Sequence, residues 1–200
     1  MSNPNMHSIL FFNPDKALVV TINFPLMCTF KFLRVFDFDG YDKRYSGILN
    51  EGIGKLIYLK HLGLRKKGFS QLPSSILYLW RIQTLDLFSR GAEVELPNKV
   101  YKLQELKHLI GLFMALQIDS LTTLQSLKVV NNESWSKINP EKLVNLGELL
   151  IYSRVCTKAK VFRSDSVVKL LRLERLSVRL SPDDSFAFLQ YYLLVLISLI

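Results

Sequence analysis

Histidine and cysteine, two side chains that often act in catalysis and metal binding, are rare in this sequence of 200 residues. The histidines are His7, His61 and His108, and the cysteines are Cys28 and Cys156. Neither cysteine has a histidine or second cysteine at the short spacing of a zinc site, and two isolated thiols indicate a reducing compartment. No pair of carboxylates stands at a spacing that indicates acid–base catalysis. We therefore predict no catalytic residue, no metal and no cofactor.

A phosphate-binding loop would be the other route to chemistry. It needs the pattern G-x-x-x-x-G-K-[ST], in which glycines allow backbone amides to surround the phosphates. Gly54-Lys55 is the one near match, but Leu49 stands where the first glycine is required. The sequence therefore predicts neither a nucleotide site nor an enzyme.

His61 and His108 each lie in a copy of Leu-Lys-His-Leu, so their shared position is a product of sequence repetition rather than a catalytic pair. Five apolar positions recur after 23 residues: Ile53, Leu56, Leu59, Leu62 and Leu64 are matched by Ile76, Leu79, Ile82, Leu85 and Leu87. A Leu-Pro pair recurs after 24 residues, at Leu72-Pro73 and Leu96-Pro97. A period of about 20 to 29 residues with an L-x-x-L-x-L core is typical of leucine-rich repeats.

The spacing within one unit predicts its local structure. The final L-x-L has period two, which places both leucines on one face of a short strand. The preceding apolar residues are three apart, which favours a helical or 3-10 segment on the opposite, convex side. The predicted fold is an α/β leucine-rich-repeat solenoid with short parallel strands on its concave face. The strands should begin near Leu33, Leu59, Ile82, Leu106, Leu124, Leu146 and Leu173, which gives about seven repeats in an irregular arc.

We assign residues 27–180 to the repeats, and the flanking segments are expected to differ from them. In residues 1–26, the apolar runs Ile9–Phe12 and Ala17–Ile22 flank Asn13-Pro14-Asp15-Lys16, as in a hairpin or two edge strands. Residues 181–200 form an apolar tail, interpreted as a truncated or altered last repeat. Its final apolar run has 15 residues, whereas a membrane-spanning helix needs about 20.

The concave face should carry the third, fifth and seventh residues of each L-x-x-L-x-L-x segment. These positions are acidic in the first repeats and basic in the last, and they include aromatic and arginine residues, which often anchor interfaces. The same pattern assigns Val129 to the core and Val130 to the concave face. We expect the basic end to contact an acidic surface. The predicted partner-binding residues are Asp37, Asp39, His61, Arg65, Asp86, Phe88, His108, Lys128, Glu148, Tyr152, Arg175 and Arg179.

Several segments resemble the leucine-rich region of plant intracellular immune receptors, the nucleotide-binding leucine-rich-repeat disease-resistance proteins of the coiled-coil class. They include GIGKLIYLKHLGLR, QLPSSI, RIQTLDL, ELPNKV and INPEKLVNLGELLI, and the similarity extends over about residues 7 to 180. The resemblance implies a cytoplasmic protein-interaction scaffold of the defence response, whose repeats restrain an ATPase domain, help sense effectors and lead to hypersensitive cell death. Implied partners are the nucleotide-binding domain of a related receptor, a pathogen effector or a host guardee. Because the phosphate loop is lacking, we expect a truncated receptor fragment without that domain.

Two other functions stay open. An extracellular or membrane-tethered repeat receptor would agree with the glycosylation triplet Asn132-Glu133-Ser134, but not with the lack of paired cysteines at the ends of the array. The Ile9–Phe12 run is also too short for a secretory signal. A net charge of +9 permits nucleic-acid binding, although no nucleic-acid-binding motif accompanies it.

Overall fold

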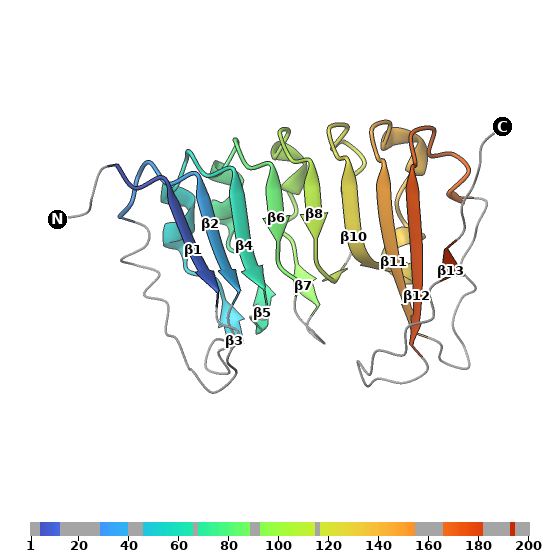
Figure 1. Cartoon of the computed structure of the whole chain (residues 1–200), viewed down its shortest axis with the longest axis horizontal. Helices are drawn as coiled ribbons and strands as arrows, with labels where there is room; N and C mark the ends of the chain where they lie inside the picture. Colours follow the sequence, from blue (N-terminus) through green and yellow to red (C-terminus); the bar gives the residue numbers. More distant parts are fainter. Residues whose placement is uncertain are drawn as a thin grey trace.

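A sheet of nine strands runs along the long axis of the molecule in the order β1-β2-β4-β6-β8-β10-β11-β12-β13 (Figure 1). The computed structural model describes residues 5–12, 29–39, 46–65, 68–88, 93–114, 117–154, 166–181 and 193–194. Neighbouring strands are parallel except for the last pair, which is antiparallel. The strands are β1 (Ser8–Phe12), β2 (Val35–Asp39), β4 (His61–Arg65), β6 (Thr84–Asp86), β8 (His108–Ile110), β10 (Ser126–Asn131), β11 (Glu148–Arg154), β12 (Arg175–Ser181) and β13 (Leu193–Leu194).

The repeat spacing correctly predicts seven of the nine strands of this sheet. Each of the seven strands from β2 to β12 in the sheet begins two residues after the leucine or isoleucine named for it above. Backbone bonds from one repeat to the next set the register; for example, the amides of Lys60 and His61 both donate to the carbonyl oxygen of Arg34. The predicted solenoid of about seven repeats is confirmed.

The strand β1 lies at the edge of the sheet and pairs in parallel with β2. The ring of Phe11 stacks on that of Phe38, with centroids 4.7 Å apart, and so extends the core to this edge. The second apolar run expected here, Ala17–Ile22, lies outside the described residues.

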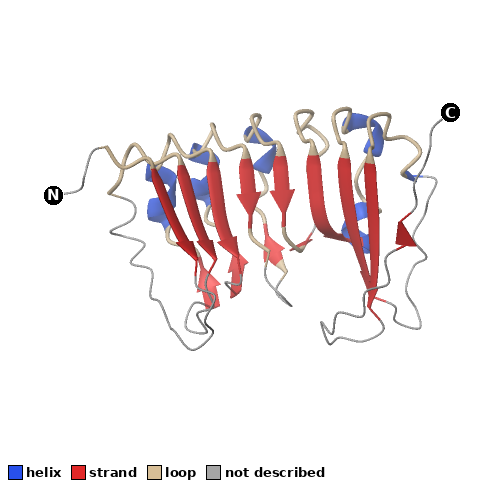
Figure 2. Ribbon diagram, viewed as in Figure 1, coloured by secondary structure: helices blue, strands red, loops and turns tan. Residues whose placement is uncertain are grey.

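A second, smaller sheet that the sequence does not predict follows the main strands. It contains β3 (Ser46–Ile48), β5 (Gly68–Gln71), β7 (Val94–Glu95) and β9 (Phe113–Met114), which pair in parallel in that order. Short helices then cover the side of the large sheet that faces away from the viewer in Figure 2. They are the 3-10 helices η1 (Glu51–Lys55), η2 (Ser74–Tyr78), η3 (Val100–Lys102) and η4 (Pro140–Lys142), with the short α2 (Asn132–Trp135).

The repeated prolines start helices in addition to ending strands. Pro73 is the N-cap of η2 with φ −67°, and Pro140 occupies the first turn of η4, where its missing N–H removes no helical bond. Leu56 and Leu79 close the helices through amides that donate to the carbonyl oxygens of Ile53 and Ile76. The spacing of three therefore predicts the 3-10 segments correctly.

The core lies between the large sheet and the helices, and the repeated leucines fill it. Within the repeat that starts the pattern, Ile53, Leu56, Leu59, Leu62 and Leu64 are all 0% exposed. These side chains belong to one continuous core cluster that includes residues from Leu33 to Leu176, as expected when each repeat is covered by its neighbours. Stacking of repeats is thus what stabilises the fold.

The main irregularity of the array follows the shortened fourth repeat, and there the structure differs from the predicted directions of Val129 and Val130. Residues 117–121 form only a turn where the repeats with η1, η2, η3 and η4 have a helix, and the register of β10 against β11 shifts between Lys128 and Val130. Val129 adopts φ 68° and is only half-buried, whereas Val130 is 0% exposed. The prediction that Val129 is in the core and Val130 on the concave face was wrong, because a bulge inserts one residue and exchanges their directions.

Candidate interaction surface

The concave face begins with a row of residues set by the parallel register of β2, β4 and β6. Asp37 pairs with Gly63, and Gly63 with Asp86, so these three stand side by side on neighbouring strands. His61 and Arg65 lie two residues to either side of Gly63 on β4, on the same face. The topology therefore brings together four of the predicted partner-binding residues, and Gly63 lies among them.

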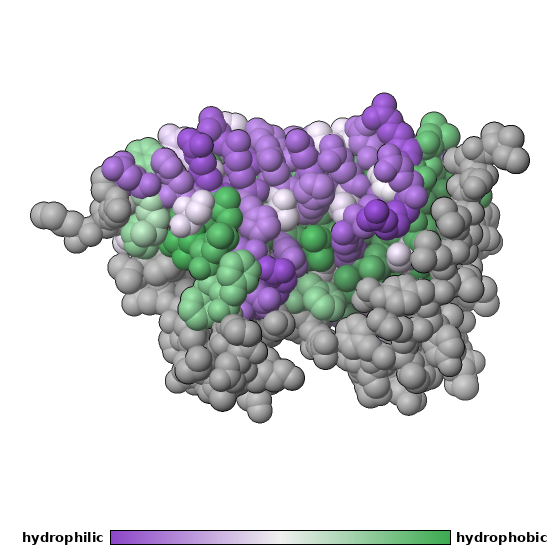
Figure 3. Space-filling model, in the orientation of Figure 1, coloured by the Kyte–Doolittle hydropathy of each residue, from purple (hydrophilic) through white to green (hydrophobic). Residues whose placement is uncertain are grey.

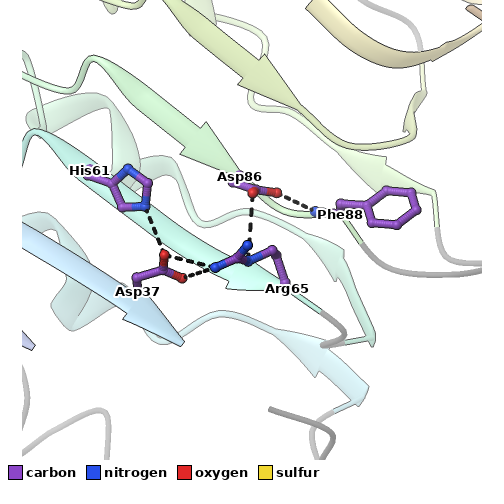
Figure 4. Close-up of polar contacts among 5 residues, drawn as sticks. All are labelled: Asp37, His61, Arg65, Asp86 and Phe88. Atoms are coloured by element: carbon purple, nitrogen blue, oxygen red, sulfur yellow. Dashed lines mark hydrogen bonds and ion pairs between the residues drawn. The ribbon is translucent and has the colours of Figure 1, made fainter. Parts of the chain in front are cut away.

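Direct contacts join these four side chains into one cluster (Figure 4). Arg65 Nη2 donates to both carboxylate oxygens of Asp37 at 2.9 Å, and its Nε lies 3.8 Å from Asp86 Oδ2. His61 Nε2 lies 3.4 Å from Asp37 Oδ2. We call Asp37, His61, Arg65 and Asp86 the acidic-end cluster.

Gly63 provides the space that the acidic-end cluster occupies. A Cβ atom at this position would lie 2.4 Å from Asp37 Oδ1 and 2.8 Å from Asp37 Cγ. Real Cβ atoms do not approach other atoms that closely, so Asp37 can lie across β4 only above a glycine. The sequence contained this signal, a glycine between two outward-facing polar residues, but nothing in the sequence relates it to Asp37.

Burial and neighbouring charges shift the pKa values of Arg65 and Asp86 in this cluster. Burial acts to lower the pKa of Arg65, because it disfavours the charged guanidinium. The hydrogen bonds to Asp37 and the negative charges of Asp37, Asp86 and Asp39 outweigh burial, so the pKa of Arg65 is raised. Burial also raises the pKa of Asp86, against the lowering effects of the Phe88 amide, which donates to Asp86 Oδ1 at 3.2 Å, and of Arg65. One guanidinium thus balances two carboxylates whose side chains are each only 14% exposed.

A second cluster, which we call the basic-end cluster, consists of Lys128, Glu148 and Arg175. Lys128 Nζ and Arg175 Nη1 each lie 2.8 Å from a different oxygen of Glu148, and Ser126 Oγ lies 3.3 Å from Oε2. Burial opposes the carboxylate charge, but the bonds from Lys128 and Arg175 outweigh it and lower the pKa of Glu148. Arg175 stays 68% exposed, so it can still contact a partner.

Half-buried residues lie between the two clusters. Ile110 pairs in register with Asp86 on one side and Lys128 on the other, and Leu150 pairs with Lys128. Burial, then the charges of Lys128 and Lys107, lower the pKa of His108. Figure 3 shows this face of the molecule, with hydrophobic groups lying below a hydrophilic band that follows the turns before the strands.

The remaining predicted residues also lie along this face. Phe88 and Tyr152 are half-buried, and Asp39 pairs in register with Arg65. Arg179 pairs in register with Tyr152, but its side chain lies outside what the structure describes. Among the described residues, no group of three histidine, cysteine, aspartate or glutamate side chains is arranged to hold a metal ion.

Comparison with known proteins agrees with this architecture. The family described as leucine-rich repeat region matches residues 5–189. The chain belongs to this family. The matched range includes every strand of the large sheet except β13, and it covers both clusters on the concave face of this repeat region.

The most informative relatives are plant proteins. The repeat region is 34% identical over 196 residues to the putative disease resistance RPP13-like protein 3 of Arabidopsis thaliana, covering 91% of this chain and 23% of that protein. It is 32% identical over 179 residues to disease resistance protein RPP13 of the same plant, covering 88% of this chain and 20% of that one. The resemblance to disease-resistance proteins is confirmed, and the chain spans less than a quarter of their length. A solved structure of a leucine-rich-repeat protein of Leptospira interrogans aligns with a TM-score of 0.48 at 21% identity, over 78% of this chain and 34% of that one.

Proposed function

We propose that this chain is a non-catalytic protein-interaction region that acts in the cytoplasm as part of the plant defence response. Its partners on this proposal are the nucleotide-binding domain of a related receptor, a pathogen effector or a host guardee. The names of its relatives support the biological setting, and the concave face supports the mode of action.

The observation that carries the proposal is the pair of charge clusters on one rigid sheet. Their side chains are already held by 2.8 and 2.9 Å contacts between neighbouring strands, so little side-chain freedom remains to be lost on binding. Ile110, between the clusters, and Leu150, beside Lys128, are half-buried and supply apolar area that a partner can cover. A preorganised, mixed surface of this kind favours recognition of a folded protein.

The alternatives find less support in the described residues. Ser134 of the glycosylation triplet is 3% exposed, and its hydroxyl donates to the carbonyl oxygen of Phe113 at 3.0 Å, which disfavours modification at Asn132. The described cations Arg65, Lys128 and Arg175 each contact a carboxylate, which disfavours the concave face as a nucleic-acid site. In the described part of the chain, no helix has the length and apolar character to cross a bilayer.

The test is a pull-down and co-expression experiment. The chain is supplied in trans with the coiled-coil and nucleotide-binding parts of a closely similar receptor that triggers cell death without a pathogen. We expect binding and weaker cell death, because the repeats restrain the nucleotide-binding domain in this proposal. A folded chain that neither binds nor changes cell death would contradict restraint in trans, and nucleotide or ester hydrolysis by the purified chain would contradict the non-catalytic role.

Two matched charge reversals locate the surface. Arg175→Glu removes an exposed cation bonded to Glu148 on the concave face. Lys169→Glu removes one of similar exposure, 54%, which lies in the turn before β12 at 2.9 Å from Glu141 of η4. We expect Arg175→Glu to weaken binding and Lys169→Glu to leave it unchanged, and the opposite order would place the partner elsewhere.

A further inference from the structure

The turns that precede β2, β4, β6 and β8, together with the last residues of η1, η2 and η3, form an exposed ridge along one edge of the large sheet. We call residues 29–34, 55–60, 78–83 and 101–107 the aromatic ridge; they lie at the upper edge of the sheet in Figure 1. Their side chains include Phe32, Tyr78, Trp80 and Tyr101, which are 48%, 68%, 50% and 42% exposed. This edge is hydrophilic overall (Figure 3), and the four exposed aromatic side chains are distributed over its segments; aromatic residues often anchor protein interfaces.

Part of the ridge is a rigid stack. The rings of Phe32 and Tyr58 lie 5.7 Å apart at 27°. The guanidinium carbon of Arg81 lies 5.3 Å from the ring centroid of Tyr58 and 4.4 Å from that of Trp80, both within cation–π range. Phe32, Tyr58 and Arg81 occupy the same position in successive repeats, so the stack follows the repeat axis. Two rings thus contact the guanidinium of Arg81, which is half-buried.

The charge of the ridge is one-sided. Its four segments contain seven lysine or arginine residues and one acidic residue, Glu105: the cations are Lys31, Arg34, Lys55, Lys60, Arg81, Lys102 and Lys107. Arg81 makes no ion pair or hydrogen bond within the described part of the chain. By contrast, Arg172, which holds the same repeat position near the other end, donates to Asn145 Oδ1 at 2.7 Å. Among the described residues, Arg172 thus has one guanidinium donor engaged and Arg81 has none.

We propose that the aromatic ridge binds an acidic segment of a partner protein, with Arg81 donating to a carboxylate of that segment. A planar guanidinium matches a carboxylate through two parallel hydrogen bonds, and Arg, Trp and Tyr are the residues that contribute most at protein interfaces. The rings of Phe32, Tyr58 and Trp80 contact one another or Arg81, which suits lateral packing against a peptide better than insertion into a bilayer. The ridge is separate from the concave face and goes beyond the proposed function.

The experiment measures binding to the full chain by fluorescence anisotropy. The probe is a labelled synthetic peptide that alternates glutamate and tyrosine, and the control peptide has glutamine at each glutamate. We expect the glutamate peptide to bind at least about tenfold more tightly, with an affinity that falls as salt is added. Arg81→Gln should weaken binding about tenfold, the loss expected for a charged hydrogen-bond donor, whereas Arg172→Gln should not change it.

A second variant covers the case in which Arg81→Gln unfolds, as judged by circular dichroism. Arg81→Lys keeps a cation over the rings but lacks the planar fork, so it should fold and bind more weakly than the native chain. Equal affinity for the two peptides, or native affinity in both Arg81 variants, would overturn the proposal. So would co-sedimentation with phosphatidylserine vesicles without peptide binding, which would make the ridge a membrane-contact surface.

Discussion

Replacement of Gly63 by alanine should break the Asp37–Arg65 contact and destabilise the fold. The new Cβ would lie 2.4 Å from Asp37 Oδ1 and 2.8 Å from Cγ, so the carboxylate must leave its site between β2 and β4. Arg65 then loses two 2.9 Å hydrogen bonds to a group whose side chain is 14% exposed. Hydrogen bonds to charged groups contribute about 1.5–3 kcal/mol, and rotation of Asp37 into water recovers part of the loss. We expect the free energy of unfolding to fall by about 1–3 kcal/mol, measured by urea denaturation.

A double-mutant cycle with Asp37→Ala isolates the cause. Once Asp37 has been truncated, the added methyl group at Gly63 has no carboxylate to displace. Gly63→Ala should then change stability by less than about 1 kcal/mol, because the lower backbone freedom of alanine in the unfolded chain offsets a small movement of His61 Nε2, which lies 3.2 Å from the new Cβ. The coupling energy between the two sites should therefore be about 1–3 kcal/mol. If Gly63→Ala costs the same in both backgrounds, the glycine does not act by making room for Asp37.

Three further predictions test other parts of the structure. Gly54→Ala should destabilise the fold by about 1–3 kcal/mol, because its Cβ would lie 2.6 Å from the backbone oxygen of Ser75, where η1 meets η2. Gly147→Ala is the control: its Cβ would have its nearest atom at 3.6 Å, so stability should change by less than about 0.5 kcal/mol. Equal denaturation midpoints for the two variants would contradict this prediction. Folding lowers the pKa of His108 from its ordinary 6.5. The contribution of neutral His108 to stability should therefore be complete above pH 6.5 and be lost as the pH falls from there through the folded-state pKa. His108→Gln should remove this loss, as measured by thermal melts at several pH values. Val129→Asn should stabilise the fold by up to about 1 kcal/mol in urea denaturation, because asparagine tolerates φ 68° better than a β-branched residue does. A destabilised variant would show that the side-chain packing of Val129 outweighs its backbone strain.

Repeat spacing was sufficient to predict the seven parallel strands from β2 to β12 of the large sheet, because the spacing of the leucines also determines which residues of neighbouring strands pair. The leucines fix which residues face the core, and the backbone then pairs equivalent residues of neighbouring repeats. The second sheet could not be predicted in this way. Its strands are two to four residues long and are held by backbone pairing, so its sequence carries no apolar period.

The bulge in β10 escaped prediction for a related reason. Val129 and Val130 are both apolar, so either can fill the core, and the alternation alone does not distinguish them. The choice is made by pairing with β11, where Val130 lies opposite Ile151. A positive φ at a β-branched residue is the cost of keeping that pairing.

His61 and His108 show how the concave face acquires its chemistry. They hold the same repeat position and lie two strands apart, each in register with Thr84. Yet His61 lies 3.4 Å from Asp37, whereas the neighbourhood of His108 includes Lys128, whose charge helps lower its pKa. Repetition thus fixes where a side chain stands, and the residues of adjacent repeats fix what it contacts. A substitution at Asp37 or Lys128 should therefore alter the neighbouring repeat as well, so specificity on this face is a property of residue pairs one repeat apart.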